Sequence, residues 1–164
     1  MSLSIPYVAG LFDGEGYITV TYYRAESFKY TRCQIKAGIG LTYAPIIQQL
    51  CDQFGGLLNI NDSAHKRSAK NRICYAWVIA SIKAADFLRH VQPHLVIKRE
   101  QCDLAIELQR HVTEHKHFMR YHSLTDMPRR EGILQYREGL VAQIKALKKE
   151  TFPLLVRGDP VFHA

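Results

Sequence analysis

The sequence predicts an α+β fold in which a helix, a hairpin, a second helix, a second hairpin and a third helix follow one another, with extra helices at the C-terminus. Pairs of neighbouring segments alternate between apolar and polar residues, as strands do in an antiparallel sheet with one covered face. Apolar residues recur at helical spacing between and after these pairs. The 164 residues can enclose one hydrophobic core but not two independent ones, so we expect a single domain over residues 1–164.

The first helix is predicted from Tyr7 to about Asp13, in a short segment of apolar and small residues. Glycines within and just after it favour close packing and then a stop. The residues alternate over 17–24 and again over 30–41, which predicts the two strands of the first hairpin. The polar face of this hairpin is the first candidate for a binding surface.

A second helix is predicted to start at Pro45, because proline suits a first helical position. Its apolar residues repeat at helical spacing until a pair of glycines stops it. Residues 57–62 and 72–80 then alternate again and form the second predicted hairpin. The loop that joins these two strands is rich in lysine and arginine.

The third helix follows directly, with Ser81 as a candidate N-cap and Pro93 at its end. Further helices are predicted at about 97–117 and 129–149, with an irregular basic loop between them. No low-complexity stretch or linker indicates a second domain.

The composition favours an anionic partner. Lysine and arginine total 22 against 15 acidic residues, a formal charge of +7 that attracts nucleic acid or an acidic membrane surface. No apolar run of about 18 residues and no signal-peptide layout occur, so we expect no membrane segment and a place inside a cell, whether an organelle, a bacterium or phage-infected cytoplasm. The four cysteines never form a C-x-x-C pair, which disfavours a zinc ribbon and a disulfide framework.

Residues 8–16, VAGLFDGEG, resemble the nine-residue motif of the LAGLIDADG homing endonuclease family. Glu15 stands where the family has its acidic metal ligand. The residues that fit the pattern directly are Ala9, Gly10, Leu11, Asp13, Gly14 and Gly16. The resemblance covers about residues 7–110 and implies the LAGLIDADG core, whose antiparallel sheet forms a DNA-binding saddle. The remaining residues, about 111–164, would be a C-terminal helical extension.

The physical chemistry of the motif agrees with what the resemblance implies. Gly10 and Gly14 are four residues apart on one helical face, so two copies of the helix could approach closely. The two Glu15 carboxylates would then repel one another unless cations lay between them. We therefore expect a homodimer with two or more Mg²⁺ ions, held by Glu15 and the backbone carbonyl of Gly14. The predicted dimer interface consists of Ala9, Gly10, Asp13 and Gly14.

Residues 93–101, PHLVIKREQ, resemble the family's segment that enters the third core helix, where a lysine reaches toward the scissile phosphate. This resemblance implies that Lys98 is catalytic and positions the water network or stabilises transition-state charge. The family often has a glutamine near the end of the second strand, where this sequence reads AGIGLTY. Thr42 or the backbone would have to supply that third polar group.

The alternation also predicts the surface that contacts double-stranded DNA, because side chains on one face of the strands can reach base edges in the major groove. The predicted base readers are Thr19, Thr21, Tyr23, Arg24, Arg32, Gln34, Lys36, Asn59 and Asn61. The predicted phosphate contacts are Lys66, Arg67, Lys70 and Arg72 in the basic loop. Together these features predict a magnesium-dependent endonuclease that makes double-strand breaks in a long, roughly palindromic site.

Two other interpretations stay open. A maturase of the same fold would bind intron RNA and assist splicing, although the presence of Glu15 favours cleavage. Residues 111–115, HVTEH, match the H-x-x-E-H pattern of zinc metalloproteases, which places two imidazoles on one helical face. Three positions define that pattern and the chain has 8 histidines, so a chance match is easy.

Overall fold

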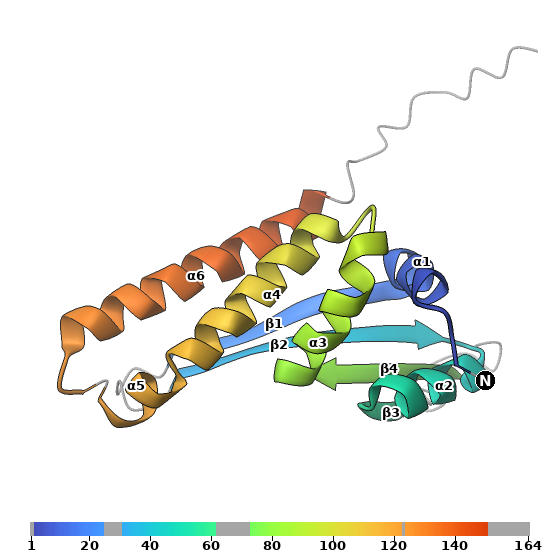
Figure 1. The fold of residues 1–164 in the computed structure, drawn as a ribbon, viewed down its shortest axis with the longest axis horizontal. Helices are drawn as coiled ribbons and strands as arrows, with labels where there is room; N and C mark the ends of the chain where they lie inside the picture. The colour runs from blue at the N-terminus through green and yellow to red at the C-terminus, as the bar shows by residue number, and fades with distance from the viewer. Residues whose placement is uncertain (1, 25–30, 62–72, 123, 151–164) are drawn as a thin grey trace, which may run out of the picture.

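The computed structural model of the chain describes residues 2–24, 31–61, 73–122 and 124–150 (Figure 1). Its elements, in chain order, are α1 (Ile5–Glu15), β1 (Gly16–Arg24), β2 (Thr31–Leu41), α2 (Ala44–Phe54), β3 (Leu57–Asn61), β4 (Cys74–Ala80), α3 (Ser81–Val91), the 3₁₀ turn η1 (Gln92–His94), α4 (Arg99–Glu114), α5 (Lys116–Tyr121) and α6 (Met127–Glu150). The predicted α+β fold is confirmed, with its helix, hairpin, helix, hairpin, helix order and its additional C-terminal helices.

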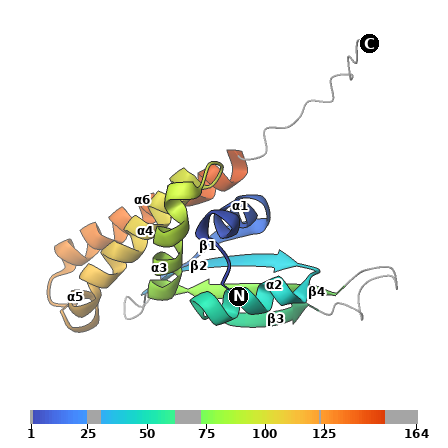
Figure 2. The same cartoon turned by 45° about the vertical axis from the view of Figure 1, so that its right-hand side comes forward.

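The four strands form one antiparallel sheet in the order β1-β2-β4-β3. Each hairpin contributes two neighbouring strands, and the pairing of β2 with β4 joins the hairpins. The helices lie on one side of this sheet (Figures 1 and 2). Helices α2 and α3 contact β4 and β2, and α6 contacts β1. The opposite face of the sheet is left open by the described helices.

A cluster of aromatic rings in the core joins α1, α2 and α3 to β4. The ring of Phe87 meets those of Phe12, Phe54 and Trp77 edge-on, at centroid distances of 5.2, 5.1 and 4.7 Å. This geometry is the one that ring electrostatics favour. The indole N–H of Trp77 also donates to the carbonyl of Gly55 at 2.7 Å. Because Phe12 is fully buried in this cluster, the cluster fixes α1 against the sheet.

The C-terminal helix α6 extends the same core. Its residues Leu140, Val141 and Ile144 are buried in one hydrophobic cluster with Ile18 and Ile35 of the sheet. Helix α6 also packs along α4. None of the described helices combines the length and the hydropathy needed to cross a membrane.

Three local predictions were wrong. Ala80, not Ser81, is the N-cap of α3, and Ser81 begins the helix with a φ of 56°. The Ser81 hydroxyl accepts a hydrogen bond from Gln34, so it is directed toward β2 rather than toward the helix. The helix expected at 97–117 spans Arg99–Glu114, because the backbone at His115 leaves the helical conformation with φ −95° and ψ 8°. The short helix α5 lies where an irregular loop was predicted.

Candidate active site and nucleic-acid interface

Helix α1 ends at Glu15 because Gly16 leaves the helix and begins β1. The N–H of Gly16 donates to the carbonyl of Phe12, and a Cβ at position 16 would lie 2.3 Å from the Phe12 ring. Position 16 therefore has no room for a side chain. The Glu15 side chain is exposed and makes no hydrogen bond or ion pair within the described part of the chain. Its carboxylate is available to an external ligand.

One face of α1 is exposed and lacks side chains at two positions. A Cβ added at Gly10 or Gly14 would meet nothing within 4 Å among the described residues, so packing within the chain does not require glycine there. Ala9 does not belong to this face, and its assignment to a dimer interface was wrong. It is fully buried beside Val8 and Phe12, because that side of α1 packs on α3 and β2.

Asp13 ties the start of α4 to the end of α1. Its carboxylate accepts hydrogen bonds from the backbone N–H groups of Val96, Ile97 and Lys98 at 2.6, 3.2 and 3.0 Å. In return, the Nζ of Lys98 donates to the backbone carbonyl of Asp13. Lys98 and Glu15 are far apart in the sequence and nevertheless lie at the same end of α1.

A cavity of about 660 Å³ lies beside this end of α1. Its walls come from the end of α1, the start of β1, the start of α4 and the end of α6, and its lining includes Tyr17, Ile18, Lys98, Gln101, Leu147 and Lys148. Burial lowers the pKa of the Lys98 amine, while the carboxylates of Asp13 and Glu15 act in the opposite direction. The segment that carries Lys98 leads into α4 and not into α3, the third helix, so that part of the prediction was wrong.

A polar side chain that the sequence-based expectation did not include lies near this end of α1. Gln101 lines the cavity, is 9% exposed and donates from Nε2 to the carbonyl of Ile144 at 3.3 Å. Sequence reasoning missed it, although it ends the PHLVIKREQ segment. Thr42 is exposed just after β2. That end of β2 lies beside the start of β1, because Gly16 pairs with Ile39.

Six predicted base readers lie together on the open face of the sheet. Residues that pair directly across antiparallel strands project to the same face. The pairs are Thr19 with Lys36, Thr21 with Gln34, and Tyr23 with Arg32. Ile18 and Ile35 point to the helix-covered face and are each 1% exposed. The face assignment that the alternation predicts is therefore confirmed.

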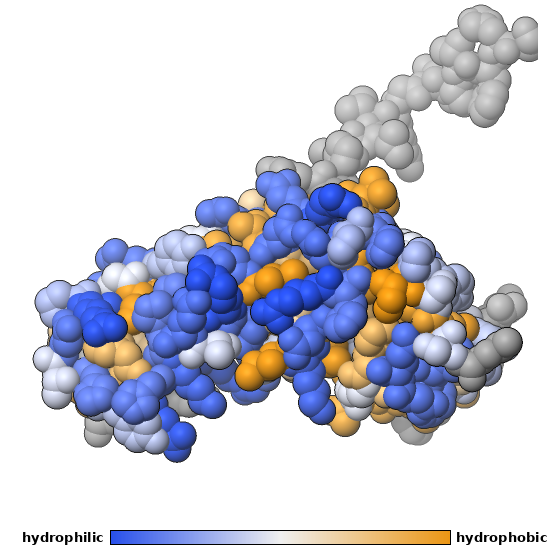
Figure 3. Space-filling model, viewed as in Figure 1, coloured by the Kyte–Doolittle hydropathy of each residue, from blue (hydrophilic) through white to orange (hydrophobic). Residues whose placement is uncertain are grey.

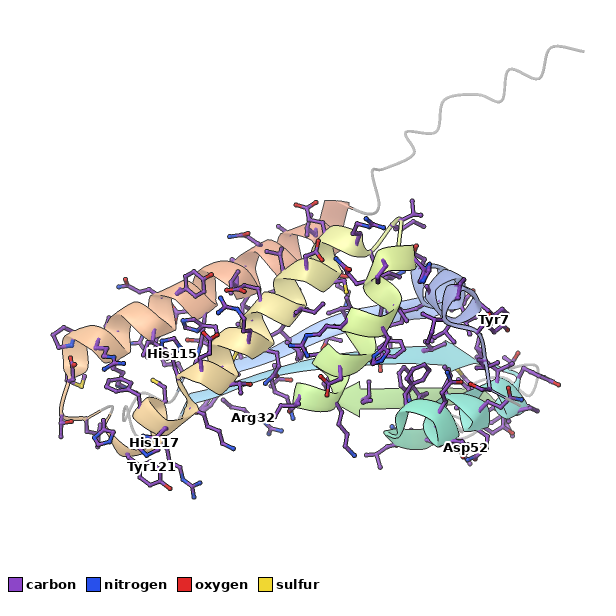
Figure 4. All side chains as sticks on the ribbon, in the orientation of Figure 1. Tyr7, Arg32, Asp52, His115, His117 and Tyr121 are labelled. Carbon is purple, nitrogen blue, oxygen red and sulfur yellow. The ribbon has the colours of Figure 1, made fainter. Side chains whose placement is uncertain are left out.

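A chain of side-chain hydrogen bonds crosses this open face from β2 to the start of α3. Arg32 donates from Nη2 to Oε1 of Gln34 at 3.0 Å, and Gln34 donates from Nε2 to the hydroxyl of Ser81 at 2.9 Å. These bonds fix which end of the Gln34 amide faces each neighbour. Arg32 is exposed on the sheet (Figure 4). Ser81 thus joins the polar surface, which the alternation within strands did not predict.

Arg24 lies on the helix-covered face, and its assignment to the DNA-binding surface was wrong. It follows Ile18 and Tyr22 at even intervals along β1, so it projects to their side. Its guanidinium donates to Glu131 at 2.7 Å and to Glu138 at 3.5 Å, both on α6. The hydroxyl of Tyr22 donates to the same Glu138 at 2.9 Å. These residues bind α6 to the edge strand.

The remaining predicted DNA contacts belong to the second hairpin. Asn59 is exposed and pairs with Ala76, which places it on the same open face as Lys36. Asn61 is the last residue of β3, and its side chain lies outside the described part of the chain. The predicted phosphate contacts Lys66, Arg67, Lys70 and Arg72 also lie outside the described residues.

Comparison with solved structures identifies the fold. The LAGLIDADG homing endonuclease I-GzeII in complex with its DNA target matches with a TM-score of 0.64 and 16% identity, over 99% of this chain and 54% of that one. The archaeal intron-encoded homing endonuclease I-Vdi141I complexed with DNA matches with a TM-score of 0.64 and 17% identity, over 94% and 88% of the two chains. The homing endonuclease I-CvuI bound to its target in 2 mM Ca matches with a TM-score of 0.63 and 14% identity, over 87% and 80%.

This chain has the LAGLIDADG homing endonuclease fold. No family model matches the sequence, and no curated protein matches it either. The assignment of the fold therefore rests on the similarity to solved structures.

Within this LAGLIDADG structure the HVTEH segment forms no metal site. His111 is buried, and its Nδ1 lies 3.3 Å from the donor Nε of Arg137. Its ring lies 4.2 Å from that of His115, and burial together with His115 and Arg137 lowers the pKa of His111 to about 4. In the part of the chain that the structure describes, no three His, Cys, Asp or Glu side chains are grouped to hold a metal ion. The described residues give the zinc metalloprotease interpretation no support.

Proposed function

We propose that this chain is one subunit of a homing endonuclease that makes double-strand breaks in a long, roughly palindromic DNA site by magnesium-dependent phosphodiester hydrolysis. The placement of Glu15 carries the proposal. Its exposed carboxylate, which has no hydrogen-bonding partner in the described chain, lies at the same end of α1 as Lys98. Strand β1, whose open face holds several proposed base readers, begins at the next residue.

The residues at the end of α1 fit a divalent cation. The Glu15 carboxylate and the backbone carbonyl of Gly14 are oxygen donors of the kind that Mg²⁺ prefers, and both residues are exposed. A bound ion of this kind activates water and stabilises the leaving oxygen of a phosphodiester. Lys98 would stabilise negative charge at the phosphate. One Glu15 from each subunit would serve two or more ions per dimer.

A second copy of the chain would complete the site, because each chain supplies one Glu15 and a double-strand break requires two hydrolyses. Gly10 and Gly14 have no side chains that would keep another helix away from this face. Apolar surface lies beside it, since Tyr7 on the outer side of α1 is 49% exposed (Figure 4) and Val96 is 84% exposed. Figure 3 shows a hydrophobic patch at the turn that precedes α4. Burying such surface favours association.

The open face of the sheet would bind the DNA. Strand β2 has 11 residues, which at about 3.4 Å per residue span roughly 37 Å. At about 3.4 Å per base pair this length corresponds to roughly 11 base pairs, so a dimer would cover roughly 20. The net charge of +7 favours approach to the phosphate backbone.

Cleavage of a randomised DNA library tests the proposal. The full chain is incubated with long duplexes over a range of Mg²⁺ and Mn²⁺ concentrations, and the cut ends are sequenced. I-CvuI on the I-CreI target in 2 mM Mg left the DNA uncleaved, so metal concentration and DNA sequence are both varied. We expect paired cuts with the wild-type chain and with Asp52→Asn, an exposed carboxylate on α2 (Figure 4). Glu15→Gln should give none, and equal cutting by Glu15→Gln would refute the proposal.

A substitution on the exposed face of α1 tests the homodimer separately. Gly10→Leu adds bulk where the described chain itself has open space, so the fold should survive while dimer and cleavage are lost together. Gly132→Leu is the matched control, because Gly132 is likewise an exposed helical glycine with open space around it. Sedimentation with target DNA measures the outcome. One protein chain per complex that still makes double-strand breaks would overturn the homodimer.

A further inference from the structure

We infer that Asp13 is a positioning residue: it clamps residues 96–98 onto the end of α1 and thereby holds the Lys98 amine beside Glu15. The inference rests on the proposed nuclease function and deepens it. Asp13 was expected at the dimer interface as a member of the motif. Its carboxylate is instead engaged by three backbone N–H groups of its own chain, from Val96, Ile97 and Lys98.

The clamp acts on residues 96–98 themselves, whereas the guanidinium of Arg99 bonds to the carbonyls of Leu95 and Pro93 just before them. Val96 and Ile97 are 84% and 60% exposed, so burial of their side chains does not hold them. The N-cap of α4 is Lys98 itself, and no side chain of the cap residue bonds to the helix. Asp13 supplies from another helix an acceptor for the N–H of Lys98, the N-cap of α4, and for the N–H groups of the two residues before it. Bonds from N–H groups to a carboxylate are stronger than those between neutral groups.

The side chain of Lys98 also bonds to Asp13. Its Nζ donates to the backbone carbonyl of Asp13, near the C-terminal end of α1, where helical carbonyls lack partners and a cation is favoured. Both the backbone N–H and the amine of Lys98 are therefore bonded to Asp13. Because Glu15 is two residues further along the chain, these bonds set the position of the amine relative to the proposed metal ligand.

A double-mutant cycle on the full-length protein tests this role. Single-turnover cleavage at saturating Mg²⁺ is measured for Asp13→Asn, Lys98→Ala and the double variant. Asparagine keeps the size of the side chain but removes its charge and replaces one acceptor oxygen with a donor. If Asp13 acts through Lys98, each single variant should be at least tenfold slower than wild type, and the double variant no slower than the slower single. Multiplied losses, or a wild-type rate for Asp13→Asn, would overturn the inference.

Three further measurements separate positioning from other roles. The KM for DNA should change less than twofold in Asp13→Asn, and the Mg²⁺ midpoint should be unchanged. A large shift of that midpoint would make Asp13 a metal ligand and overturn the inference. Asp103→Asn is the matched control, because Asp103 of α4 accepts a side-chain hydrogen bond from Gln92 outside the cavity. Its cleavage rate should equal that of wild type.

Amide hydrogen exchange decides the clamp without any cleavage assay. In the wild-type protein the N–H groups of Val96, Ile97 and Lys98 should exchange at least tenfold more slowly than an unbonded exposed loop, despite the exposure of the first two side chains. Rapid exchange of these N–H groups would overturn the clamp. Because the measurement uses the wild-type protein, it remains decisive even if Asp13→Asn fails to fold. If the wild-type chain cuts no DNA, the proposed function fails, and exchange alone then decides whether Asp13 holds this segment.

Discussion

The two ends of β1 both carry charged residues, and the chain uses them differently. Just before the strand, Glu15 is exposed and makes no hydrogen bond or ion pair in the described chain. At the far end, Arg24 donates to Glu131 and Glu138 of α6 at 2.7 and 3.5 Å. The charges at the far end hold the C-terminal helix on the sheet, whereas the carboxylate at the near end is open to an external ligand.

The difference teaches that a charged residue at a strand end indicates function only when the chain leaves it unbonded. Even the neighbours of Glu15 bond through the backbone: Asp13 accepts from N–H groups, and Lys98 donates to a carbonyl. Substitution of Glu15 should therefore change cleavage and spare stability. Substitution of Arg24 should do the reverse.

Glu15→Gln should have the largest effect. The amide keeps the shape of the side chain but binds a divalent cation poorly, so single-turnover cleavage should fall by about a thousandfold or more. The melting temperature should stay unchanged, since Glu15 has no bond within the described chain. A variant that loses stability in parallel with activity would break the distinction between the two ends of β1.

Lys98→Ala should come next, with cleavage slowed about a hundredfold and DNA affinity nearly unchanged, because one charge-stabilising donor contributes mainly to the transition state. Gel-shift titration and single-turnover rates separate the two quantities. Lys145→Ala, an exposed lysine of α6, is the control for loss of one positive charge. An unchanged rate in Lys98→Ala would make this residue an ordinary surface lysine.

Gln34→Ala should relax base preference at one or two base pairs of the target, with a loss of about 1 to 3 kcal/mol in discrimination there. Base preference at the other positions should stay unchanged. Ser81→Ala should relax the same positions by less, because Ser81 only orients the Gln34 amide. Sequencing of the cut library gives both profiles. Separate positions for the two variants would show that the hydrogen-bonded chain on the open face does not act as one unit.

A change of pH should have the smallest effect on cleavage, because it acts through the protonation of His111 in α4 and changes the stability of the fold. Burial and its neighbours lower the pKa of His111 from 6.5 to about 4. Between these two pH values the unfolded chain binds a proton at this histidine and the folded chain does not, so the stability of the fold is complete above pH 6.5 and falls as the pH is lowered toward 4. The melting temperature of wild type should drop between these two values, and His111→Gln should flatten that slope. His94→Gln, an exposed histidine, should not. Equal slopes in all three proteins would contradict this.

The order of elements could be predicted because alternation and helical spacing record which side chains are buried. Ile18, Ile35 and Ile39 all lie in the core, as their spacing indicates. The partners of Arg24 could not be predicted in this way. They are 107 and 114 residues away in the sequence, and no local pattern at Arg24 distinguishes an ion pair with α6 from a DNA contact.

The candidate site could be predicted only where a side chain belongs to a motif. Glu15 and Lys98 were selected in this way, and the structure brings them to one end of α1. The hold of Asp13 on the start of α4 could not be predicted, because backbone N–H groups leave no signature in the sequence. Gln101 and Ser81 were missed for a related reason, since their places depend on contacts between separate elements.

The glycines of the motif are required for different reasons. Randomising each glycine codon and selecting for cleavage would distinguish these reasons. At position 16 a Cβ would lie 2.3 Å from the Phe12 ring and 2.5 Å from its carbonyl oxygen, so any other residue must displace the last turn of α1, which carries both Asp13 and Glu15. Which residues are accepted at position 16 therefore depends on contacts within one chain. At Gly10 and Gly14 the described chain would accept a side chain. Any intolerance at those two codons therefore reports on what packs against the helix from outside, and its size would measure how closely that partner approaches.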